Sequence, residues 1–356
     1  MLALPKGFIK YMAKRASTAL ISLVIAVYVS IILANLGGLV DEMVKADLLT
    51  SITLNVRNNP AYQGLPATEK QKIIENLYQS ALEAKGLNKP FIVRSIYYLK
   101  DAITLDLGTA LYLTSDSGSK KVKNIILERL PQTILLFTTA SLVSFFINLF
   151  GGLMLARKYG SRMDRIVAAL APTSVIPGWV YGLLLLLVFY SWLHVLPAGG
   201  IVDYPPPENP ILYALSVLKH MILPLSAWII SGLFLGLYSS RTFFLIFSTE
   251  DYVEAAKAKG LPPQRIDTLY VLRPTLPSIV TSFSFTLIGS WGGAIITETV
   301  FDWPGLGRLL SAALSYPDPP VIIGEVTIYA WLLTITVLIL DVIYGLLDPR
   351  IKVGGG

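Results

Sequence analysis

Six long apolar stretches alternate with polar segments along this chain of 356 residues. A helix needs about 20 apolar residues to cross a hydrocarbon core of about 30 Å, because lipid offers the backbone no hydrogen-bond partners. The stretches that meet this length lie near residues 16–36, 131–156, 166–193, 221–240, 278–297 and 322–346. The pattern therefore predicts an all-α polytopic membrane protein with six transmembrane helices.

Prolines interrupt two of these spans. Pro172 and Pro177, followed by Gly178, fall inside the third span, and Pro224 opens the fourth. Proline removes a backbone donor and clashes with the preceding turn, so we expect kinks or broken helices at both places. A broken helix can border a transport pathway, and it can equally be a simple kink within a bundle.

The composition agrees with a membrane protein and narrows the chemistry. The chain is 54% hydrophobic and 15% charged, with a mean hydropathy of +0.62, which is unlike a soluble globular protein. It has no cysteine, and its two histidines, His194 and His220, do not make a metal site alone. Neither HExxH nor GxSxG occurs, so we expect no catalytic residue, no cofactor-binding residue and no metal site, and hence no enzyme.

Positive charges predict the orientation. In membrane proteins, short cytoplasmic loops contain an excess of Lys and Arg. The loops 194–220 and 298–320 of this chain contain only Lys219 and Arg308, which is typical of external loops. The first apolar run is about 20 residues long without a small-residue cleavage site, which favours an anchor over a signal peptide. We expect a multi-pass protein of the cell membrane with both termini in the cytoplasm. Residues 1–36 would contain the cytoplasmic N-terminus and the first span, and residues 347–356 the cytoplasmic C-terminus. The orienting cations are Lys6, Lys10, Lys14, Arg15, Arg157, Lys158, Arg162 and Arg165.

The segment 37–130 is too long for the charge rule, and alternation of the spans makes it an extracytoplasmic domain. Residues 68–86 have apolar positions near helical spacing, and residues 88–111 predict an amphipathic helix ending at a glycine. The aromatics of "SIYYL" within that helix suit a membrane interface, and they suit packing inside the domain equally well.

A polar helical segment interrupts the apolar pattern within the loop 241–277, which the alternation of spans predicts to be cytoplasmic. "STED" offers a hydroxyl N-cap, "VEAAKAK" is strongly helical, and Gly260 ends the helix. After Pro262 and Pro263, a second helix over 264–272 places Ile266, Leu269 and Tyr270 on one face. We call residues 248–272 the knob. The knob is too ordered to be a simple connection between two spans. Its pattern indicates either a protein-docking site or a helix lying on anionic lipid.

Several motifs of this chain resemble one family of transporters. "DYVEAAKAKGL" (251–261) is similar to the EAA loop of ABC importer permeases. The chain resembles the dipeptide/oligopeptide permease family over nearly its whole length, and its long external segment resembles the first permease subunit of such systems. The other matching motifs are "KPFIVRSIYYLKDAITLDLGTAL" (89–111), "ILERLPQTILL" (126–136), "SRMDRI" (161–166), "LPAGG" (196–200), "LKHMILP" (218–224), "ETVFDWPGLGRLL" (298–310) and "LLDPRIK" (346–352).

The resemblance implies a type I ABC importer permease fold, with residues 131–346 holding spans two to six. It implies half of a translocation pathway for oligopeptides, or for similar solutes such as oligosaccharides. Its implied partners are a second permease, two ATPases and an extracytoplasmic solute-binding protein, besides membrane lipid and no nucleic acid. No Walker A pattern occurs here, so this chain binds no cofactor, and ATP and Mg²⁺ belong to the ATPases.

Two groups of residues follow from the resemblance as candidate site residues. In the knob, Glu254, Ala255, Ala256 and Gly260 would couple to the ATPases, although Glu254 alone could be an ordinary solvated charge. In the loop after span five, an external gate or docking rim would use Glu298, Phe301, Asp302, Trp303 and Gly305. Phe301 and Trp303 could instead be interface-belt aromatics that hold a re-entrant turn.

Two carboxylates in the sixth span leave a different class of function open. Glu325 and Asp341 fall at membrane depth, where a charge faces protein or water rather than lipid. Such groups can bind coupling ions in a secondary transporter, which is the alternative to an ABC permease. Helix packing or solvation at the membrane edge explains them as well.

Overall fold

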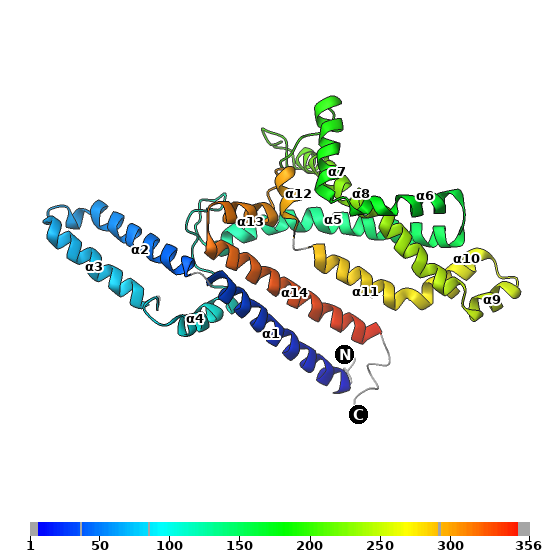
Figure 1. Ribbon diagram of the computed structural model, residues 1–356, viewed down its shortest axis with the longest axis horizontal. Coiled ribbons are helices and arrows are strands. Elements are labelled where there is room, and N and C mark those ends of the chain that lie inside the picture. The colour runs from blue at the N-terminus through cyan, green and yellow to red at the C-terminus, as the bar shows by residue number, and fades with distance from the viewer. Residues whose placement is uncertain (1–5, 36–37, 85, 291–292, 348–356) are drawn as a thin grey trace. The chain divides into compact units, whose positions relative to one another are not determined.

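The computed structural model describes residues 6–35, 38–84, 86–290 and 293–347, and most of these residues are helical (Figure 1). Within these ranges the only β pairing is an isolated bridge between Thr109 and Lys121. Four helices are long and apolar enough to cross a membrane, or five if one sharply bent pair forms a single span. An all-α polytopic membrane protein is confirmed. The predicted cytoplasmic C-terminus lies outside the described residues, apart from Leu347.

The chain divides into two compact units, of which the first contains residues 1–128 and 312–356. In this unit α1 and α14 pack side by side in opposite directions. Arg15 near the start of α1 accordingly pairs with Asp341 near the end of α14. Its helices are α1 (Lys6–Asn35), α2 (Leu39–Asn58), η1 (Pro60–Tyr62), α3 (Ala67–Ala84), α4 (Phe91–Ile103), the start of α5 (Val122–Arg157), the end of α13 (Leu306–Ser315) and α14 (Pro319–Leu347).

The second unit contains residues 129–311. Besides the rest of α5 and α13, its helices are α6 (Arg162–Leu170), η2 (Ala171–Val175), α7 (Gly178–Leu185), η3 (Leu186–Trp192), α8 (Pro210–Ser248), α9 (Asp251–Ala258), α10 (Pro263–Arg265), η4 (Ile266–Leu272), α11 (Arg273–Ser290) and α12 (Ile295–Val300).

The prolines act differently at the two predicted breaks. Residues 162–175 and 178–192 meet at 98°, with Pro177 at the N-cap of α7, so the third predicted span is broken. Pro224 does not open the fourth span, because α8 begins 14 residues earlier with Asn209 as its N-cap and continues through this proline. The Asn209 side chain accepts hydrogen bonds from the amides of Ile211 and Leu212, which fixes this start.

The fifth predicted span corresponds to α11, an 18-residue helix that begins at Arg273 and contains several Ser and Thr residues. It is not among the helices that are apolar enough to span by themselves. The count of six spans therefore stays a prediction.

Asp318 joins the segment that follows α4 to the start of α14. Its carboxylate is fully buried and accepts hydrogen bonds from three successive amides, those of Leu111, Tyr112 and Leu113, at 3.1, 2.9 and 3.0 Å. The predicted helix over 88–111 ends early, at Ile103, because the chain turns at Leu105 (φ +58°) to bring these amides to Asp318.

We expect Asp318→Ala to lower the stability of the protein by about 3 kcal/mol, because each unpaired amide costs about 1–3 kcal/mol. The measurement is the apparent melting temperature of the detergent-solubilised chain. Asp106→Ala removes an exposed carboxylate from the same segment and is the control. Equal melting temperatures for the two variants would contradict this role of Asp318.

Candidate functional site

The knob begins differently from the expected pattern. The Ser248 hydroxyl donates back to the carbonyls of Phe244 and Leu245, and Thr249 donates to Leu245 and Ile246. The two hydroxyls therefore finish α8 instead of capping α9. Glu250 is the N-cap of α9 and makes no side-chain capping bond. The predicted hydroxyl N-cap is wrong, because both side chains bond one turn back along their own helix.

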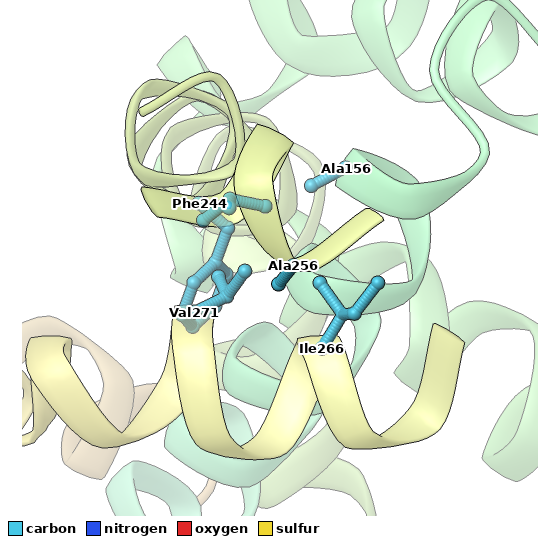
Figure 2. Close-up of a cluster of buried hydrophobic side chains, with 6 residues drawn as sticks. Ala156, Phe244, Ala256, Ile266 and Val271 are labelled. Atoms are coloured by element: carbon cyan, nitrogen blue, oxygen red, sulfur yellow. The ribbon is translucent and has the colours of Figure 1, made fainter. Parts of the chain in front are cut away.

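A small apolar core holds the knob together (Figure 2). Val253 and Ala256 project from one side of α9 and are buried with Ala156, Phe244, Ile266 and Val271, which come from α5, α8 and η4. Positions 253 and 256 are three residues apart and so share a helix face. Ala256 thus belongs to the interior of the knob and is not available to a partner.

The opposite face of α9 is open. Glu254 and Ala255 are exposed, and Glu254 Oε1 accepts a hydrogen bond from Lys257 Nζ at 2.7 Å. The side chains of this ion pair are 61% and 48% exposed. Such an exposed pair contributes little to stability, so the described fold does not depend on Glu254.

Gly260 ends α9 in a left-handed conformation, with φ +70°. The Gly260 amide donates to the Lys257 carbonyl at 2.9 Å, and the Leu261 amide donates to the Ala256 carbonyl at 3.3 Å. This pair of bonds is a Schellman motif, and Leu261 completes it by packing on the knob core. Gly260 therefore reverses the chain so that the second helix can return over the first.

The second helix of the knob differs from an α-helix in pitch. After α10, residues Ile266–Leu272 form a π-helix that continues directly into α11. Bonds from i to i+5 bring Ile266 and Val271, five residues apart, to the knob core. Leu269 was expected on the same face as Ile266, but it is exposed whereas Ile266 is buried, because that expectation assumed 3.6 residues per turn.

One ion pair joins the knob to the end of α5. Arg157 Nη1 lies 3.5 Å from Asp267 Oδ2. Burial raises the pKa of Asp267, and the nearby Arg157 opposes this rise. Beside the pair is an open groove of about 350 Å³, lined by Phe150, Leu153, Met154, Arg157, Lys158 and Asp267.

A second contact, which no sequence pattern predicted, holds the short loop 157–165. Arg241 of α8 donates from Nε and Nη2 to the two oxygens of the buried Asp164, at 2.7 and 2.8 Å. Asp164 also accepts from the amide of Gly160 at 2.9 Å. Of the charges in this loop, Arg157 pairs with Asp267 of the knob, whereas Arg162 and Arg165 are exposed.

The other predicted site, around residues 298–305, is largely buried. Glu298 is fully buried and accepts from the Thr133 hydroxyl at 2.8 Å and from the Arg308 amide at 2.9 Å. Burial raises the pKa of Glu298, and these hydrogen bonds oppose the rise. Gly305 lies directly against this carboxylate, because a Cβ there would be 2.5 Å from either of its oxygens.

The aromatic residues of this loop face the interior of their unit. Trp303 is buried with Leu136, Phe137 and Met221, and its Nε1 donates to the Gln132 carbonyl at 3.0 Å. Phe301 is buried in a separate cluster with Leu223 and Ala227. Asp302 is exposed and pairs with Arg308 at 2.7 Å. Of the five predicted residues, only Asp302 presents a charge at the surface of the chain.

Glu325 and Asp341 lie far apart on α14. Sixteen residues separate them, which is about 24 Å along an α-helix. Asp341 Oδ1 lies 3.5 Å from Arg15 Nε, so a basic partner exists that sequence reasoning did not find. The described residues contain no cluster of three or more His, Cys, Asp or Glu side chains able to hold a metal ion.

Comparison with known proteins gives a consistent set of relatives. Residues 148–353 match the model of a family described as binding-protein-dependent transport system inner membrane component. The dipeptide transport system permease protein DppB of Bacillus subtilis is 29% identical over 309 residues, which is 86% of this chain and 94% of that protein.

Two further relatives have similar coverage. The di/tripeptide transport system permease protein DppB of Pseudomonas aeruginosa is 30% identical over 301 residues, covering 80% of this chain and 87% of the relative. The oligopeptide transport system permease protein AppB of Bacillus subtilis is 28% identical over 282 residues, covering 79% and 87%. These relatives are permease proteins of transport systems and not enzymes.

We expect Gly260→Ala to destabilise the protein by about 1 kcal/mol, because the left-handed conformation is strained for a residue with a Cβ. Nothing lies within 4 Å of the added methyl group, so no steric clash contributes. Gly260→Asn should lose less, since Asn tolerates this conformation. The measurement is the apparent melting temperature, with Gly64→Ala as an unstrained control; an unchanged value for Gly260→Ala would contradict the turn.

Gly305→Ala should be more damaging, by about 3 kcal/mol, because the methyl group would overlap Thr133 and the Glu298 carboxylate. We expect poor recovery of folded protein in detergent, measured by size-exclusion chromatography and thermal unfolding. If Gly305→Ala were no worse than Gly260→Ala, Glu298 would not be as tightly enclosed as the structure indicates.

Proposed function

Because the chain belongs to the family of binding-protein-dependent transport system inner membrane components, we propose that it is the permease subunit of an ATP-binding-cassette importer for peptides. The knob is the observation that carries this proposal. It places an open, charged helix face on a compact core that α9 shares with α5, α8 and η4. A loop that only joined two spans would not need such a core.

The proposed cargo is a dipeptide or short oligopeptide. The relatives reported above are named for dipeptides, di/tripeptides and oligopeptides, and they cover most of this chain. Nothing in the site favours oligosaccharides, which we do not propose. The choice among peptides would rest mainly with a solute-binding protein that delivers them.

The proposed partners are a second permease, two ATPases and an extracytoplasmic binding protein. ATP and Mg²⁺ would bind to the ATPases, because this chain contains no Walker A pattern. The two permeases would form the pathway together. Asp302, exposed and paired with Arg308, is the residue of the loop 298–305 that could contact the binding protein.

We assign the knob to the coupling step. Glu254 and Ala255 would face the ATPase, where a small residue permits close approach and a carboxylate can pair with a cation. Val253, Ala256 and Gly260 would act through the structure of the knob itself. Closure of the ATPases on ATP would then move α9, and the shared core would pass the movement to α5, α8 and α11.

This coupling requires the knob to lie in the cytoplasm. The cations before the first span and in the loop 157–165 support that orientation. The antiparallel pairing of α1 and α14 supports both termini on one side of the membrane.

The alternative of an ion-coupled secondary transporter has less support. Glu325 and Asp341 are about 24 Å apart along α14, so they cannot bind one ion together. Asp341 is also paired with Arg15.

Replacing Glu254 tests the coupling role. We expect Glu254→Gln to lower peptide uptake roughly tenfold, which is the loss of one charge-assisted hydrogen bond. The chain should still fold, since Glu254 is exposed. The measurement is uptake and ATP hydrolysis by the complete transporter in proteoliposomes. Ala255→Leu, which adds bulk to the same open face, should also separate hydrolysis from uptake.

The matched control is Glu75→Gln in the external segment. Glu75 is also an exposed helical carboxylate, and it accepts from the side chain of Gln79 one turn later at 2.8 Å. This variant should transport normally. Normal uptake by both Glu254→Gln and Ala255→Leu would remove the open face of α9 from the coupling step.

A further inference from the structure

The helix α4 has an apolar stripe that no described residue of its own unit covers. Ile92, Val93, Ile96 and Tyr97 lie on one side of this 13-residue helix, and Ile92 and Ile96 are 72% and 59% exposed. In a water-soluble insertion, such a continuous stripe would be expected to face inward.

The opposite side of α4 packs against a membrane span. Ala102 is buried in a cluster with Leu23, Val27 and Ile31 of α1, and Tyr98 and Leu99 pack on the same cluster. The hydroxyls of Ser95 and Tyr28 are hydrogen-bonded at 3.1 Å. The stripe therefore faces away from α1, beside which α4 lies (Figure 1).

The contacts on α1 give the depth of α4. The apolar run of α1 extends from Lys10 to Leu33. Tyr28 is five residues inside its end, about 7.5 Å along the helix axis, and Leu23 is ten residues inside, about 15 Å. Because half of the hydrocarbon core is about 15 Å thick, α4 lies beside the part of α1 that crosses one leaflet.

Contacts with α14, the last helix, independently indicate the same membrane depth for α4. Ile323, Ala330 and Trp331 of α14 also pack against this cluster, and all three lie inside its apolar run from Pro319 to Val342. Two spans thus place α4 among membrane-depth residues, although it belongs to the segment that connects spans.

The charged residues of α4 are arranged to spare the stripe. Arg94 is buried on the other side, where it pairs with Asp41 and donates to the Leu87 carbonyl at 3.0 Å. Lys89, just before α4, and Lys100, near its end, lie at the two ends of the stripe, and Lys89 Nζ is 5.0 Å from the centre of the Tyr97 ring. Lysines at the ends can reach the headgroups while their stems cover apolar surface.

We propose that α4 is an interfacial membrane anchor, with Ile92, Val93, Ile96 and Tyr97 inserted among phospholipid acyl chains in the leaflet where α1 ends. The side of α1 turned away from α4 also exposes apolar side chains, including Ile25. The anchor fixes the base of the external segment at the membrane. Its test is independent of cargo and of ATPase coupling, so it stands apart from the function proposed above.

The absence of cysteine makes the test direct. Single cysteines replace Ile96, Ile25 and Leu77 in the full chain, reconstituted in phosphatidylcholine vesicles. Ile25 in α1 is the lipid reference and is 57% exposed, whereas Leu77 in α3 is the water reference and is 43% exposed. Each cysteine is reacted with a water-soluble maleimide, and separately carries a nitroxide whose relaxation by oxygen and by a nickel complex is measured.

We expect Ile96→Cys to react roughly tenfold more slowly than Leu77→Cys, because apolar surroundings raise the thiol pKa and deplete the thiolate. Its nitroxide should be relaxed by oxygen and not by the nickel complex, as at Ile25→Cys. If Ile96→Cys reacted and relaxed like Leu77→Cys, the stripe would lie in water and the proposal would be overturned. If the nitroxide at Ile96→Cys were shielded from both relaxing agents, a protein partner would cover the stripe, which would also overturn the proposal.

Discussion

The packing of Val253 and Ala256 against their neighbours is the contact on which the functional arrangement depends. These two small side chains are all that α9 contributes to the buried core of the knob, and they meet residues from α5, α8 and η4 there. Because a closely packed core deforms little, a displacement of α9 must move the helices that share the core. The open face of α9 can vary its chemistry without disturbing this contact, since Glu254 is bound only to an exposed lysine.

Three buried carboxylates organise the segments between the long helices. Asp164 receives the guanidinium of Arg241, Asp318 receives three amides, and Glu298 receives a hydroxyl and an amide. A polar group next to lipid or in a dry interior must find a partner within the protein. Each carboxylate is the hydrogen-bond acceptor for backbone or side-chain donors that would otherwise be unpaired at a turn. Each therefore stabilises one conformation of a turn whose sequence alone would allow many.

The sequence predicted the structural features that depend only on residues close together in the chain. Apolar length located the four long helices, Pro177 located the break in the third span, and Gly260 located the end of α9. Contacts between distant residues could not be predicted in this way. Thr133 and Glu298 are 165 positions apart and Leu111 and Asp318 are 207, and no local pattern marks either pair. The π-helix at 266–272 was missed for another reason, because apolar spacing was interpreted with the α-helical period, which placed Leu269 on the same face as Ile266.

In the function proposed above, this chain works as one permease of a complex driven by separate ATPases. Affinity purification of the tagged chain from native membranes, with the bound proteins identified and quantified by mass spectrometry, tests this assembly. We expect recovery of two ATPase copies and one second permease for each chain, with loss of the ATPases when the open face of α9 is altered. Recovery of the chain alone, together with uptake driven by an ion gradient and without ATP, would exclude such a complex.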